Sequence, residues 1–275
     1  MKKSIVFFKK ISFNLLLIIL FLACSPSHQK NIENKPPIKI ENTHSIIFID
    51  KSISLDPENE FTNKKYTHIF KDIVSHNIKI KGDKIDIYYV HENTSKAKVW
   101  SLKTKSEILT SDTLSANSTD VEIAKNKFNI SLRKEKADFL NKCIESLNYL
   151  NESNSKTKTD IWSSLIVLNK LIDPNEKRKV VVYYLSDMIE SMDGKDRRDF
   201  HKQLPKNKVE AENWAKQDFD LLKKQLDIEK FKNIEINIAL PYPPSSTIKE
   251  NNPNVTYYWQ SLFSLFGVER EIEEI

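Results

Sequence analysis

Three groups of oxygen-bearing side chains stand out in this sequence. Asp50, Ser52 and Ser54 lie at alternate positions, a spacing that places three short side chains on one side of a tight turn. Thr159 precedes one apolar run, and Asp187 ends another. Such side chains offer oxygen atoms for binding, and an aspartate can also act as a nucleophile. Because serine is a common residue, the first spacing alone is a weak signal, and its value depends on where the groups lie in the fold.

The first and last groups stand at the ends of predicted strands, and Thr159 stands at a predicted junction between a loop and a helix. Residues 44–50 and 179–187 are continuous apolar runs, which indicate strands covered on both faces. Further strands are predicted at 84–90 and 233–240, with a short edge strand at 97–102. Residues 103–120 have no clear period and are interpreted as a loop or insertion.

Amphipathic helices separate these strands. Apolar residues recur at helical spacing in five segments, namely 61–74, 139–150, 160–172, 209–227 and 257–267. The alternation predicts an α/β fold, a doubly wound, mostly parallel Rossmann-like sheet with helices on both faces. Ligands of such sheets bind beyond the carboxyl ends of the strands, so we expect the three groups to meet there.

In this order and spacing the three groups resemble the metal-ion-dependent adhesion site (MIDAS) of von Willebrand factor A (vWA) domains. The resemblance implies that Ser52, Ser54 and Thr159 supply hydroxyl ligands to a divalent metal, and that Asp50 and Asp187 complete the shell directly or through water. Magnesium suits such hard oxygen ligands, with manganese or calcium as alternatives. Since hydroxyls leave the ion incompletely neutralised, a carboxylate from a protein partner would complete the coordination. The implied function is a non-enzymatic adhesion or assembly module.

The sequence departs from the vWA pattern at two loop positions. Family members often have glycine before the threonine and after the last aspartate, where this chain has Lys158 and Met188. One alternative is therefore a structural lipoprotein with a metal-free vWA scaffold. Another is an aspartyl-phosphate phosphotransferase with Asp50 as nucleophile, although Ser52 stands where enzymes of the haloacid dehalogenase type carry a second aspartate.

The first 23 residues have the pattern of a lipoprotein signal peptide. Lysines precede an apolar stretch at 11–22, which is short for a spanning helix, and a small residue then precedes Cys24. This ending resembles a bacterial lipobox, which implies lipidation at Cys24 and a place in the bacterial cell envelope, facing the periplasm. The Pro-, Asn- and Lys-rich residues 24–43 predict a flexible tether. Cys143 is then the remaining cysteine, and its helical spacing indicates a core position.

The charge balance argues against nucleic acid as a partner. The formal charge is +5, but without the four lysines of the leader 39 basic residues face 38 acidic ones. With three glycines in the chain, a P-loop, a dinucleotide fingerprint and a nucleophile elbow are excluded. The six histidines form no HExxH motif and are expected at surface or helix positions.

The sequence thus predicts a vWA-like domain at 44–240, followed by a C-terminal extension at 241–275. In the extension, Trp259, Leu262, Phe263 and Phe266 fall on one side of the predicted helix, which favours packing into the core.

Overall fold

The computed structural model describes residues 41–52, 59–108, 117–149, 155, 157–243, 245–248, 251–268 and 273–275. The predicted signal peptide, Cys24 and almost all of the tether lie outside these residues, as does Ser54. The described chain belongs to one compact unit, Glu41–Ile275.

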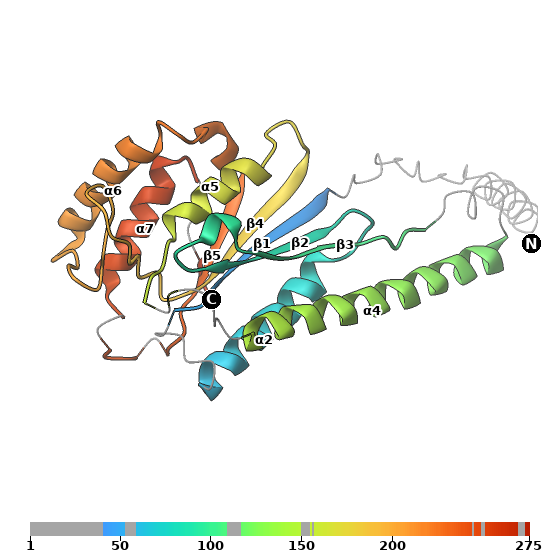
Figure 1. The fold of residues 1–275 in the computed structure, drawn as a ribbon. Coiled ribbons are helices and arrows are strands. Elements are labelled where there is room, and N and C mark those ends of the chain that lie inside the picture. The colour runs from blue at the N-terminus through green and yellow to red at the C-terminus, as the bar shows by residue number, and fades with distance from the viewer. Residues whose placement is uncertain are drawn as a thin grey trace, which may run out of the picture. The chain divides into compact units, whose positions relative to one another are not determined.

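The fold is an α/β fold with one mostly parallel sheet, as the sequence predicted (Figure 1). The strands are β1 (Asn42–Asp50), β2 (Lys84–Val90), β3 (Lys98–Lys103), β4 (Arg178–Leu185), β5 (Ile234–Ala239) and β6 (Glu273–Glu274), in the spatial order β3-β2-β1-β4-β5-β6. Only β3, at the edge, runs antiparallel to its neighbour among these strands. From β1 the sheet continues through β2 and β3 on one side, and through β4, β5 and β6 on the other. The strand order therefore reverses between β1 and β4, and a ligand site is expected at the carboxyl ends of these two strands.

The helices cover both faces of the sheet (Figure 1). One face carries α2 (Glu60–Asn77) and α4 (Ser118–Asn148), and the other carries α5 (Trp162–Leu171), α6 (Lys208–Leu222) and α7 (Pro253–Leu265). Two short 3-10 helices, η1 (Thr94–Lys96) and η2 (Ile228–Phe231), lie in the connections. Within the described residues, no helix has both the length and the apolar character needed to cross a membrane.

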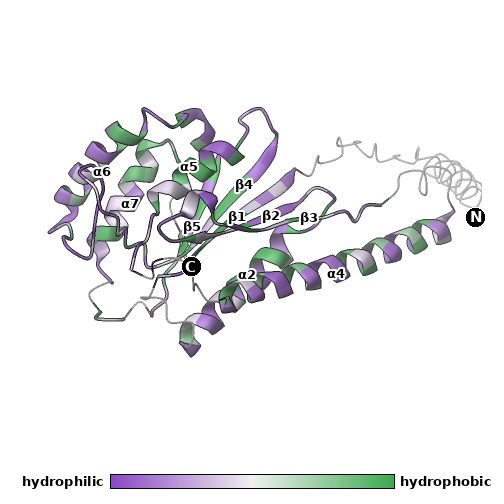
Figure 2. Ribbon diagram, in the orientation of Figure 1, coloured by the Kyte–Doolittle hydropathy of each residue, from purple (hydrophilic) through white to green (hydrophobic). Residues whose placement is uncertain are grey.

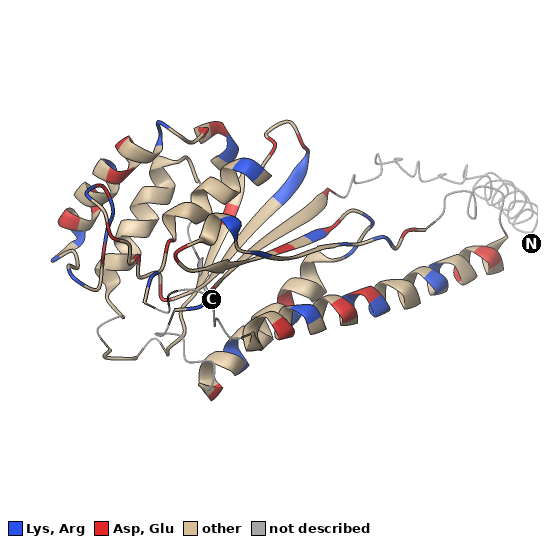
Figure 3. Ribbon diagram, viewed as in Figure 1, with Lys and Arg blue, Asp and Glu red and all other residues tan. Residues whose placement is uncertain are grey.

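The central strand β1 is buried over its last seven residues, which explains its unbroken apolar run. Its side chains alternate between two cores: Ile46 and Phe48 join the cluster under α5, α6 and α7, and Ile47 and Ile49 join the cluster under α2 and α4. Figure 2 shows the hydrophobic residues concentrated in the central strands and in α5. The charged residues lie mainly on the outer helices and loops (Figure 3).

The C-terminal helix is part of the main core. The predicted apolar side of α7 is confirmed, because Trp259, Leu262, Phe263 and Phe266 are each 0% exposed. The helix begins earlier than residue 257, at Pro253, where the side chain of Asn252 accepts a hydrogen bond from the Asn254 amide.

Several sequence expectations are wrong in detail. Residues 42 and 43, assigned to the tether, belong to β1, and helix α6 ends at Leu222 rather than 227. The largest difference is α4, which begins at Ser118, inside the segment interpreted as a loop, and 21 residues before the predicted start at 139. Two histidines expected at surface or helix positions are buried instead: His44 within β1 and His91 directly after β2.

Candidate functional site

The structure places Asp50 and Ser52 together at the end of β1. The carboxylate of Asp50 is 2% exposed, and its Oδ1 accepts a hydrogen bond from the Ser52 amide at 2.8 Å. The Ser52 hydroxyl also bonds to this carboxylate. The chain therefore turns tightly around Asp50, as the alternate spacing predicts.

The end of β4 supplies the second half of the site. Ser186 Oγ donates to Asp50 Oδ2 at 2.7 Å, which joins the ends of the two strands directly. Asp187, the next residue, is 3% exposed, and its Oδ1 accepts a bond from the Ile189 amide at 3.0 Å. The two aspartates predicted for the site are thus brought together at the carboxyl edge of the sheet.

Met188, one of the two departures from glycine, has a backbone conformation that favours glycine. Met188 has φ of 61°, in the left-handed region that glycine enters at no steric cost. Bonds on both sides hold it there: its amide donates to Ser186 Oγ at 2.9 Å, and its carbonyl accepts from Trp259 Nε1 of α7 at 2.7 Å. The bond from Trp259 of α7 therefore helps to hold a left-handed turn that glycine could adopt without steric cost.

The two carboxylates repel each other in a buried site. Burial raises the pKa of Asp50 to about 7, and the charge of Asp187 adds to this shift, while hydrogen bonds from Ser186 and Ser52 oppose it. Tyr66 of α2 lies beside both carboxylates. Burial, and then their charges, raise its pKa well above its usual value, and its hydroxyl donates to the Ala239 carbonyl at 3.1 Å.

Thr159 lies on a neighbouring loop that is tied to the loop after β4. Its side chain is 1% exposed, and its backbone forms an antiparallel bridge with Ser191. The Ser191 amide donates to the Thr159 carbonyl at 2.9 Å, and Ser191 Oγ donates to the Thr157 carbonyl at 2.9 Å. These bonds therefore hold Thr159 to the segment that follows Asp187.

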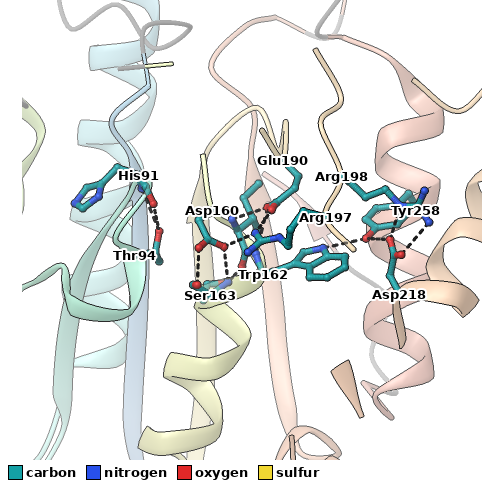
Figure 4. A network of polar contacts seen from close by, with 12 residues as sticks. His91, Thr94, Asp160, Trp162, Ser163, Glu190, Arg197, Arg198, Asp218 and Tyr258 are labelled. Atoms are coloured by element: carbon teal, nitrogen blue, oxygen red, sulfur yellow. Dashed lines mark hydrogen bonds and ion pairs between the residues drawn. The ribbon is translucent and has the colours of Figure 1, made fainter. Parts of the chain in front are cut away.

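A buried ion network reinforces this connection (Figure 4). Glu190 is 0% exposed, and its Oε2 accepts bonds from the amides of Ile161 at 2.7 Å and Trp162 at 3.3 Å, at the start of α5. Arg197 binds Glu190 and also Asp160 Oδ1, the latter at 2.6 Å. Asp160 in turn accepts bonds from the amide and hydroxyl of Ser163 at 2.9 and 2.6 Å. Burial raises the pKa of Glu190 to about 8, and the charge of Arg197 opposes this shift.

The network continues to α6 and α7. The guanidinium of Arg197 lies 4.9 Å from the ring centre of Trp162, whose Nε1 donates to the Tyr258 hydroxyl at 3.1 Å. Tyr258 donates to Asp218 Oδ2 at 2.7 Å, and Arg198 binds the same carboxylate. The loop after β4 is thus bonded to α5, α6 and α7.

The donor set fits a small hard cation. The buried carboxylates of Asp50 and Asp187 and the hydroxyl of Ser52 are oxygen donors of the kind that Mg²⁺ prefers, and the loop bonded to the segment after Asp187 carries the hydroxyl of Thr159. Burial and the charge of Asp187 raise the pKa of Asp50, and a cation held by these residues would offset both effects. Among the described residues no three His, Cys, Asp or Glu side chains gather as a metal-binding group, so an ion here would depend on the hydroxyl oxygens.

No protein-family model matches this chain, and no curated protein matches it. Solved structures give distant likenesses. An aerotolerance-related membrane protein from Bacteroides fragilis NCTC 9343 is 11% identical, with a TM-score of 0.38 over 85% of this chain and 90% of that one. Proximal thread matrix protein 1 from the mussel byssus, with a zinc-occupied MIDAS motif, is 14% identical, with a TM-score of 0.34 over 78% of this chain and 39% of that one. A von Willebrand factor type A protein from Catenulispora acidiphila is 11% identical, with a TM-score of 0.33 over 82% and 42% of the two chains. The chain spans less than half the length of the last two.

Sequence reasoning missed the residues that support the site. Ser186 stood beside Asp187 and could have been found, because its hydroxyl follows the same strand. Glu190 and Arg197 carried no such signal, since a buried charged residue looks like a solvated one in a chain with 29% charged residues.

Proposed function

We propose that this chain is an exported, lipid-anchored, vWA-like module that binds an acidic protein partner through a divalent metal. Asp50, Ser52, Ser54, Thr159 and Asp187 would hold the ion. The observation that carries the proposal is the pair of buried carboxylates at the ends of β1 and β4, joined through Ser186. Burying two like charges side by side costs stability, and such a cost is typical of a site built for a ligand.

Each group has a separate role in this proposal. Asp50 and Asp187 supply the negative charge, while Ser52 and Thr159 supply neutral oxygens from two different loops. A bound Mg²⁺ would keep water at any octahedral position that these donors leave open, and a carboxylate of the partner could replace that water. The role is recognition, without a covalent step.

Calorimetric titration of the purified chain with Mg²⁺ and Mn²⁺ tests the site. We expect binding by the wild-type protein and a loss of about tenfold or more in affinity for Thr159→Ala, because a ligand is removed. Thr157→Ala is the matched control, since it removes an exposed hydroxyl from the same loop and should leave the affinity unchanged. Absence of binding by the wild type, or equal affinities for the two variants, would exclude the assignment.

Partner capture from an envelope extract, with and without chelator, tests the second part of the proposal. Capture that is lost in chelator and restored by Mg²⁺ is the expected result. Capture that persists in chelator would support the metal-free scaffold instead. Anchoring is tested separately, because Cys24→Ala should move the protein from the detergent phase to the aqueous phase.

A further inference from the structure

Lys51 stands between two of the proposed ligands, and its side chain reaches the end of a distant helix. Its Nζ donates to the Leu147 carbonyl at 2.8 Å and to the Tyr149 carbonyl at 3.0 Å. Its amide donates to the Val90 carbonyl at 3.1 Å, so the backbone of the same residue remains attached to the end of β2. One residue therefore connects the loop after β1 with the C-terminal end of α4.

A second contact from the sheet holds the same helix end. Tyr89 of β2 donates from its hydroxyl to the Ser146 carbonyl at 3.2 Å, and its ring stacks on Tyr149 with centroids 5.7 Å apart. Lys51 Nζ lies 4.9 Å from the centre of the Tyr89 ring. Lys51, Tyr89 and the last residues of α4 thus form one cluster beside the site.

The end of α4 needs such a partner. The last carbonyls of a helix lack partners within the helix and favour a nearby cation. All residues in the last turn of α4 are described, and none of them is basic. Lys51 supplies the missing positive charge from the loop of the candidate metal site.

A displacement of the first part of α4 would be transmitted to the C-terminal end of the helix. It has 31 residues, so it is about 46 Å long, and among the described residues its buried side chains lie in its last third, namely Phe139, Cys143, Ser146 and Leu147. Its first part extends beyond the sheet (Figure 1) and exposes Ile123 and Ile130 by 47% and 68%. In the chain, Thr159 follows Tyr149 by ten residues, so the loop that carries Thr159 comes after this helix in sequence.

We propose that Lys51 is a positioning residue that couples the C-terminal end of α4 to the metal site. The coupling rests on the proposed metal-binding function and adds a means of regulating it. Displacing α4 would pull on Lys51 through its bonds to the helix end. It would thereby shift the end of β1 and the loop after it, which carry Asp50 and Ser52, and so lower the affinity for metal. Because linkage is reciprocal, metal binding would stabilise the end of α4.

Lys51→Met and Lys142→Met form the test pair. Lys142 lies on α4 itself, with its Nζ 3.9 Å from the ring centre of Trp100, and is outside the candidate site. We expect Lys51→Met to weaken Mg²⁺ binding in calorimetry by about tenfold, as loss of a group that orients metal ligands does. Lys142→Met should bind like the wild type. Unchanged affinity in a folded Lys51→Met protein overturns the coupling.

Hydrogen exchange provides the second readout. Mg²⁺ should slow exchange of the amides at 146–149 in the wild-type protein and leave them unaffected in Lys51→Met. If Lys51→Met does not fold, the wild type alone decides, because unchanged exchange at 146–149 on saturation with Mg²⁺ contradicts the coupling.

Failure of the proposed function has a different signature. If the wild type binds no Mg²⁺, that function is wrong, and the coupling is tested in chelator. In chelator, the amides at 146–149 and at 50–52 should exchange faster in Lys51→Met than in either the wild type or Lys142→Met. Equal rates in the three proteins would show that Lys51 does not couple the helix to the loop.

Discussion

The loops after β4 and β1 form the two halves of the candidate site, and they are held in different ways. The loop after β4 is bonded through Glu190 and Arg197 to the start of α5, and through Met188 to Trp259 of α7. The loop after β1 is bonded to the rest of the fold by Lys51, which reaches the end of α4. Ser186 joins the two halves at Asp50.

This difference indicates which half of the site can move. Breaking the β4 half would leave the buried carboxylate of Glu190 without Arg197, which is costly, so we expect Asp187 and Thr159 to form a fixed frame. The bonds of Lys51 lie nearer the surface and can exchange with water at a smaller cost. The geometry of the site should therefore be adjusted at Asp50 and Ser52, against an immobile β4 half.

Glu190→Ala should have the largest effect. The substitution leaves Arg197 and two amides of α5 without their buried carboxylate, and loss of one partner of a buried pair costs about 3–5 kcal/mol of unfolding free energy. Urea unfolding in chelator measures this cost. The matched control is Glu229→Ala, which removes a carboxylate from an exposed ion pair with Lys232 and should change stability little. If the two variants were equally stable, the β4 half would not be the rigid one.

The pH dependence of stability should be the next largest effect. The pKa of Asp50 is about 7 in the folded chain against 3.8 ordinarily, so the folded state binds more protons between these values. Unfolding free energy in chelator is therefore highest below about pH 4 for this group and falls through about pH 7, by roughly 2–4 kcal/mol.

Asp50→Asn isolates the contribution of Asp50 to this pH dependence. The variant should lose the share of the pH slope due to Asp50 and be more stable than the wild type near pH 8 in chelator, because one buried charge is absent. Added Mg²⁺ should stabilise the wild type at this pH and leave Asp50→Asn unchanged. An identical pH slope in both proteins would show that the pKa of Asp50 is not raised in the folded chain.

Trp259→Phe tests the turn at Met188 and should have a smaller effect. Phenylalanine keeps an aromatic ring in the core but cannot donate to the Met188 carbonyl, which is then buried without this bond. The expected loss is about 1–3 kcal/mol in unfolding free energy. Trp214→Phe, on the partly buried ring that stacks against Phe200, is the control for ring size. A loss no greater than in the control would mean that the turn is stable without the indole bond.

The sequence predicted the sheet better than the supports of the site, for physical reasons. Strand β2 was predicted with both of its ends, because a buried strand needs an unbroken apolar run. The first part of α4 was missed because it buries no regular apolar stripe, and β6 because it pairs through two residues. Position alone indicated four of the candidate ligands, because they are short polar residues next to strands or helix starts: Asp50, Ser52, Thr159 and Asp187.

The remaining supports depend on contacts between distant segments. The left-handed turn at Met188 is held by a residue 71 positions away, and Lys51 reaches carbonyls 96 and 98 positions away. A backbone carbonyl has no identity in the sequence, so a lysine that binds one carries no local signal. Lys158, the other departure from glycine, pairs with Asp193 at 2.6 Å, a contact equally hidden in the sequence.

Lys51→Met should have the smallest effect on stability and thereby completes the comparison. In chelator it removes two bonds from a charged donor that is only partly buried, so the expected loss is about 1–2 kcal/mol, well below that of Glu190→Ala. Methionine keeps most of the aliphatic stem against Tyr89, so the loss reports the bonds to α4. Urea unfolding of the two variants under the same conditions measures the ratio. A loss for Lys51→Met as large as for Glu190→Ala would mean that the β1 loop is held as firmly as the β4 loop, and an adjustable half of the site would then have no physical basis.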